Sequence, residues 1–169
     1  MNAYLDTAQG SLRAFTGDTS LSVDLLCVGD AEVAEWVGVS PVERLSEWWF
    51  QFAKIFIFDN EDTLLQPKRI VRQFDQLARE RALSGQGVTI AQEAGIRALA
   101  AYPVRAISKN QADRPAFVLL ALASQETAFS DQLACQILSE TVSLLEIVIQ
   151  IGWRDEIFEL RHGSDEGTS

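Results

Sequence analysis

Polar and apolar residues along Ser130–Trp153 follow the spacing of one α-helix. The polar residues recur in steps of three and four, at Gln132, Gln136, Ser139, Ser143, Glu146 and Gln150. These steps place them on one narrow stripe of a helix, and nearly every other position is apolar or small. A helix with so narrow a polar stripe must be covered on most sides. The pattern therefore predicts a central helix over about 131–152, with Ser130 as its N-cap.

A second helix is predicted over 41–58. It begins at the capping box Ser40-Pro41-Val42-Glu43, which has proline at the first helical position. One broad face, which we assign to the core, consists of Leu45, Trp48, Trp49, Phe52, Ile55 and Phe56. Phe50, Ile57 and Phe58 project away from that face. They either meet a second layer of helices or form an exposed patch.

The other apolar segments are interpreted as helices too, over about 3–15, 67–84, 89–102, 115–126 and 153–160. Phe117–Leu122 is apolar all round, which is typical of a buried helix, although a buried strand has the same pattern. Residues 21–28 alternate as a strand does, but a lone strand has no evident partner here, so a helix is favoured and a strand stays open.

We therefore expect an all-α fold, a single-domain bundle of six to eight helices over 1–162. The 131–152 helix would lie at its centre, with the 41–58 and 115–126 helices packed on it. Residues 163–169 are polar and are predicted to be a disordered C-terminal tail.

Charge is unevenly distributed along this acidic chain, whose net charge is −10. Residues 1–66 hold 11 acids and 3 bases, 67–115 hold 4 acids and 9 bases, and 116–169 hold 9 acids and 2 bases. The basic segment is either paired internally with its acidic neighbours or is a binding surface. Its basic cluster Lys68, Arg72 and Arg79 is small, lacks interleaved aromatic residues and belongs to an acidic chain, so direct nucleic-acid binding is not expected.

Candidate chemistry is sparse. The one histidine, His162, adjoins the polar tail, which argues against histidine triads and histidine metal sites. The acidic run 59–62 lacks the glycine and spacing of a calcium loop. Cys27 and Cys135 lie far apart and are interpreted as buried free thiols. We predict no catalytic residues, metal or cofactor; Glu146 is the best candidate for a buried carboxylate beside a small-ligand pocket.

Membrane insertion is not expected either. The 131–152 helix is long enough to span a bilayer, but it carries Glu140, Glu146 and several glutamines. No segment has the pattern of a signal peptide, so a cytoplasmic location is predicted.

These features favour a non-enzymatic module that binds a protein partner and occludes or neutralises it, as an immunity protein, antitoxin or anti-defence inhibitor does. An acidic surface associates fast with basic partners, such as toxins or nucleic-acid enzymes. Two alternatives stay open. The chain is a structural or regulatory module that self-associates as a homodimer, or it binds a small ligand near Glu146.

The predicted partner-binding site is the end of the aromatic helix together with the acidic turn after it. It consists of Phe50, Ile57, Phe58, Asp59, Glu61 and Asp62. Aromatic side chains outside the core can anchor an interface, because such residues dominate interface hot spots. The neighbouring carboxylates can steer a basic partner without being buried.

Overall fold

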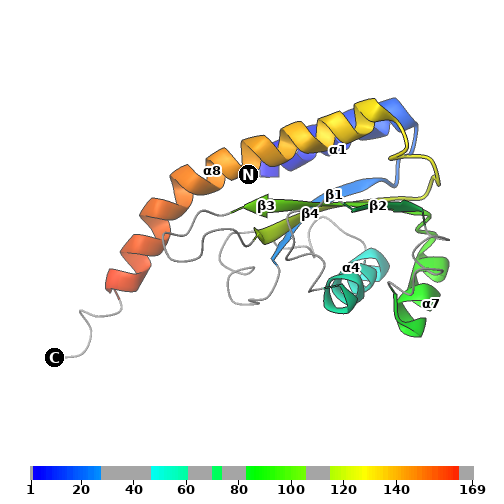
Figure 1. Ribbon diagram of the computed structural model, residues 1–169, viewed down its shortest axis with the longest axis horizontal. Coiled ribbons are helices and arrows are strands. Elements are labelled where there is room, and N and C mark those ends of the chain that lie inside the picture. Colours follow the sequence, from blue (N-terminus) through cyan, green and yellow to red (C-terminus); the bar gives the residue numbers. More distant parts are fainter. Residues whose placement is uncertain (1, 28–46, 61–69, 74–82, 106–114, 164–169) are drawn as a thin grey trace.

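A computed structural model describes residues 2–27, 47–60, 70–73, 83–105 and 115–163. In chain order the elements are α1 (Asn2–Thr16), β1 (Ser22–Cys27), α4 (Glu47–Asp59), β2 (Ile70–Gln73), α7 (Gly85–Ala94), β3 (Ala98–Arg105), β4 (Pro115–Ala123) and α8 (Gln132–Gly163). Helices α1 and α8 lie along one side of the sheet, and α4 and α7 lie along the other (Figure 1).

The strands form one antiparallel sheet in the order β1-β4-β3-β2. β4 pairs with β1 from Phe117↔Cys27 to Leu122↔Ser22, and its other edge pairs with β3. The segments 98–102 and 117–123 of these interior strands are buried throughout. A strand that is covered on both faces is a continuous apolar run rather than an alternating one.

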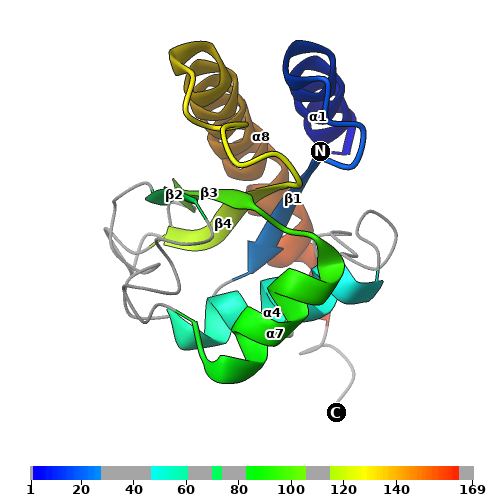
Figure 2. The same cartoon turned by 90° about the vertical axis from the view of Figure 1, so that its right-hand side faces the viewer.

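The sheet separates two apolar cores. On one face the strand residues Val23, Leu25, Tyr102, Phe117 and Leu119 share a cluster with Leu5, Ala8 and Leu12 of α1 and with Ala134, Leu138, Leu145 and Ile149 of α8. On the other face Leu26, Leu99, Val118, Leu120 and Leu122 share a cluster with Trp49, Phe52 and Phe56 of α4 and Ala91 of α7. Figure 2 shows the two helix pairs on opposite sides of the sheet, a sandwich of helices, sheet and helices.

The prediction of an all-α bundle of six to eight helices is wrong, because a four-stranded sheet forms the middle layer. The predicted helix over 67–84 contains β2, the one over 89–102 is divided between α7 and β3, and the one over 115–126 is β4. Residues 21–28, for which a helix was favoured, contain β1. The partner of β1 is β4, far along the chain, so local sequence could not reveal it.

α8 is a single helix of 32 residues on the outside of the sandwich. The helix predicted over 131–152 is present, but it is not central, and it continues through Gly152 to Gly163. Asp131 rather than Ser130 caps it, since the Asp131 carboxylate accepts a hydrogen bond from the Leu133 N–H at 2.7 Å. Of the predicted tail, Gly163 ends α8 and 164–169 lie outside the described residues.

α1 also protects the open edge of the sheet. The Gln9 side-chain oxygen accepts a hydrogen bond from the Val23 N–H of β1 at 3.1 Å. Arg13 Nε donates to the Leu21 carbonyl at 2.7 Å, just before the strand begins. Such side-chain contacts satisfy backbone groups at a sheet edge that would otherwise be available to another chain.

A buried carboxylate, Asp18, joins the turn after α1 to the turn after β4. Its two oxygens accept hydrogen bonds from the backbone N–H groups of Ser20, Ser124 and Gln125 and from the hydroxyls of Ser20 and Ser124, at 2.6–3.1 Å. Burial alone raises the pKa of Asp18, but the hydrogen bonds from Ser20 and Ser124 outweigh it and hold the pKa below its ordinary value of 3.8. The ionised form therefore stabilises the fold.

We expect Asp18→Asn to lower the free energy of unfolding at neutral pH by about 2 kcal/mol, because charge-assisted hydrogen bonds are lost. A carboxyl whose pKa is lowered by folding stabilises the protein above its unfolded pKa, and that stabilisation disappears as the pH falls through the folded value. The difference between wild type and variant should therefore be full above about pH 5 and shrink as the pH falls below about 4. Urea unfolding across this pH range measures it, with exposed Glu93→Gln as the control. A difference that stays constant with pH would contradict the proposed role of the charge.

Candidate functional site

The predicted partner site lies at the end of α4. Phe50, Ile57 and Phe58 belong to this helix, and Asp59 is its last residue. The side chains of the first three lie outside what the structure describes, as do Glu61 and Asp62 altogether. Of the six predicted site residues, Asp59 is the one whose side chain can be followed.

The Asp59 carboxylate is held by the start of α7. Its Oδ2 accepts a hydrogen bond from the Ser84 N–H at 2.7 Å, and Ser84 is the N-cap of α7. This helix begins at Gly85, before the start of the helix predicted over 89–102. A carboxylate near a helix N-terminus is favoured by the helix dipole. Asp59 therefore joins two helices, which is a structural role whatever else it does.

The aromatic face of α4 is largely the core that its spacing predicts. Trp49, Phe52 and Phe56 are buried, and the Phe52 and Phe56 ring centroids lie 6.2 Å apart. Trp49 Nε1 donates a hydrogen bond to the Ala94 carbonyl of α7 at 3.1 Å. Trp48, which was also assigned to the core, is 54% exposed, so that assignment is wrong. The pattern was broad enough to include a residue at the margin of the buried face.

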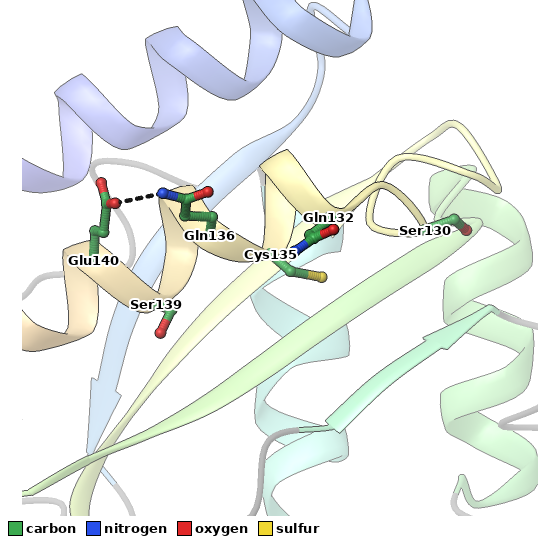
Figure 3. Close-up of a pocket in the computed structure, with 6 residues that line it drawn as sticks. All are labelled: Ser130, Gln132, Cys135, Gln136, Ser139 and Glu140. Atoms are coloured by element: carbon green, nitrogen blue, oxygen red, sulfur yellow. Dashed lines mark hydrogen bonds between the residues drawn. The ribbon is translucent and has the colours of Figure 1, made fainter.

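Glu146 contacts the sheet rather than a ligand pocket. Its Oε1 accepts a hydrogen bond from the Arg105 N–H at the end of β3, at 3.0 Å. An open hollow of about 560 Å³ lies elsewhere on α8, and Figure 3 shows its lining: Ser130, Gln132, Cys135, Gln136, Ser139 and Glu140. Glu146 is not among these residues, so the structure does not bring it to the hollow.

The lining of this hollow consists of hydroxyl, amide, thiol and carboxylate groups, several of them already hydrogen-bonded. Gln136 Nε2 donates to Glu140 Oε1 at 2.9 Å, and the half-buried free thiol of Cys135 donates to the Phe129 carbonyl at 3.4 Å. Within the described part of the chain, no group of three His, Cys, Asp or Glu residues could hold a metal ion. This polar lining can accept a small polar molecule.

Among the side chains that the structure describes, five large apolar ones lie exposed on the helix layer formed by α1 and α8. We name them the α1–α8 strip: Tyr4, Phe15, Leu133, Leu144 and Ile147, which are 39–53% exposed. Leu133, Leu144 and Ile147 recur on one face of α8, displaced around the helix from the buried positions Leu138 and Leu145. The two helices lie side by side on the same face of the sheet (Figure 2).

This strip was not predicted from the sequence, because the 131–152 helix was placed at the centre of a bundle, where other helices would cover all of its apolar side chains. The signal was available in the spacing of Leu133, Ile137, Leu144 and Ile147, which continue around α8 next to its polar stripe. By length and composition Gln132–Gln150 could cross a membrane, and 28% of that window is buried inside the protein. The low buried share reflects the position of α8 on one face of the sheet.

Comparisons with protein-family models, with curated proteins and with solved structures found no match to this chain.

We expect Asp59→Ala to lower the free energy of unfolding by about 1 kcal/mol, since the N-cap residue of α7 loses its acceptor. Chemical denaturation measures the effect, with Glu93→Ala, an exposed acid in α7, as the matched control. If both variants are as stable as the wild type, Asp59 does not hold the two helices together.

Proposed function

We propose that this chain is a non-enzymatic, acidic protein-binding module that occludes or neutralises a basic protein partner. The observation that carries the proposal is the α1–α8 strip. Single apolar residues are ordinary on a protein surface, but a group extending over two adjacent helices is typical of an interaction site. The net charge of −10 favours a partner of opposite charge and fast association with it.

The chemistry of the described residues supports binding more than catalysis. Asp18, whose pKa is lowered, has a structural role, because its oxygens accept hydrogen bonds from the two turns that it joins. The alternative of a small-ligand pocket near Glu146 is weakened, because that carboxylate bonds to the backbone of β3. We propose the cytoplasm as the location, where the thiol of Cys135 would stay reduced.

Self-association remains the second candidate, because an exposed apolar strip can pair with a copy of itself. The two candidates differ in how they depend on concentration. Sedimentation velocity over a wide range of protein concentration detects a homodimer, whereas a partner-binding module stays monomeric until the partner is added.

We expect the chain to bind a basic partner stoichiometrically and to associate with it faster at low salt. Cross-linking in the native host followed by affinity purification would supply the partner, which is then purified separately. Its association rate should fall by about tenfold or more from low to high ionic strength, because salt screens the steering field. The activity of the partner should be fully blocked at a fixed molar ratio.

Two results would contradict this prediction. Inactivation of the partner by a small fraction of an equivalent would show turnover, and the module would then be an enzyme. An association rate that does not change with salt would show that the negative charge of the chain plays no part in the encounter.

A further inference from the structure

The α1–α8 strip has the dimensions of a docking surface for a helix. From Leu133 to Ile147 it covers about 21 Å along α8, at 1.5 Å per residue. Tyr4 and Phe15 extend it across α1, and half-buried Ile137 lies between the exposed strip and the core. Amphipathic helices of partner proteins bind to apolar surfaces of this kind through residues spaced by three or four.

Charge at the strip argues against a second copy of the chain as the occupant. Glu140 lies midway between Leu133 and Ile147 on the exposed face of α8, and the Gln136 side chain holds its carboxylate at the surface. A two-fold pairing of the α8 strips would place Glu140 opposite Glu140 of the other copy. Like charges in contact are unfavourable, and each copy has a net charge of −10.

The rim of the strip is acidic as well. At the end near Phe15, an open hollow of about 380 Å³ is lined in part by Phe15, Gln125 and Asp131, and exposed Glu126 lies in the same turn as Gln125. The basic residue of α1, Arg13, is engaged elsewhere, because it donates a hydrogen bond to the Leu21 carbonyl beside β1. The described charges along the strip therefore favour cationic side chains on the occupant.

We propose that the α1–α8 strip docks an amphipathic helix of the partner protein, whose apolar stripe covers Leu133, Leu144 and Ile147 and whose lysine or arginine meets Glu140. This assignment rests on the proposed function, because it names the surface and the kind of element by which the basic partner is held. The apolar side chains of the strip anchor the partner helix by burying its apolar stripe. The Glu140 carboxylate favours a partner helix with a basic residue and fixes the position of that helix along α8.

A synthetic peptide tests the assignment directly. The probe is a helical peptide of about 15 residues, the length that covers the strip. It carries leucines at helical spacing and flanking lysines. Two companions are a scrambled peptide of the same composition and a peptide with glutamates in place of the lysines. We expect the lysine peptide to bind the full chain, and we expect NMR amide shifts to concentrate in α1 and in 133–147 of α8.

Variants separate the strip from the rest of the surface. The double change Leu144→Gln and Ile147→Gln alters exposed side chains, so the fold should survive, and lysine-peptide affinity should fall about tenfold or more. Trp48→Gln is the matched control, since Trp48 is equally exposed but lies on α4 across the sheet, and it should leave affinity unchanged. Glu140→Lys should weaken the lysine peptide and strengthen the glutamate peptide.

The assignment is overturned if the double variant binds the lysine peptide as the wild type does, or if the scrambled peptide binds equally well. It is also overturned if the wild type forms a dimer that the double variant does not, because the strip would then belong to a second copy. If the purified basic partner binds the double variant normally, the docking surface is wrong and the proposed function stands. If the lysine peptide binds at the strip but no basic partner is found, the proposed function fails while the docking surface stands.

Discussion

The need to cover both faces of one antiparallel sheet governs this structure. Alternate side chains of β4 belong to opposite cores: Phe117 and Leu119 pack toward α1 and α8, and Val118 and Leu120 pack toward α4 and α7. A sheet with apolar side chains on both faces is stable in water only when each face is covered. The helices are placed to meet this need, so α8 presents one face to the sheet and leaves the others exposed.

The same condition explains which elements sequence reasoning could predict. α1, α4 and α8 have one buried face each, and their periodicity identified them as helices, although α8 continues to Gly163 rather than ending at 152. Residues 117–123 have no periodicity, because neighbouring side chains are buried on opposite faces, and a run of this kind fits a buried helix equally well. β4 was therefore predicted as a helix, although a buried strand was recognised as having the same pattern.

The exposed α1–α8 strip was hard to predict for a different reason. The spacing along α8 shows two apolar arcs beside a polar stripe, but it does not show which arc meets the sheet. Leu138 and Leu145 are buried, whereas Leu133 and Leu144 are exposed, and the two pairs are chemically alike. The choice depends on where α1 and β3 lie, which is tertiary information. Asp59 could be predicted to lie at a helix end, but its bond to Ser84 depends on a second helix distant in sequence.

The pairing of β1 with β4 has a consequence for how the chain folds during synthesis. Asp18 bonds to Ser124 and Gln125, and β1 pairs along its length with 117–122. α1 and β1 therefore cannot reach their final contacts until the ribosome has released residues beyond 125, because β4 is the strand that pairs with β1. Contacts that close so long a stretch of chain form slowly, because the entropy of closure is lost before the contacts stabilise it. In that interval the apolar residues of 21–26 have no covering sheet, so the nascent chain is most open to chaperones and to misassembly early in its synthesis.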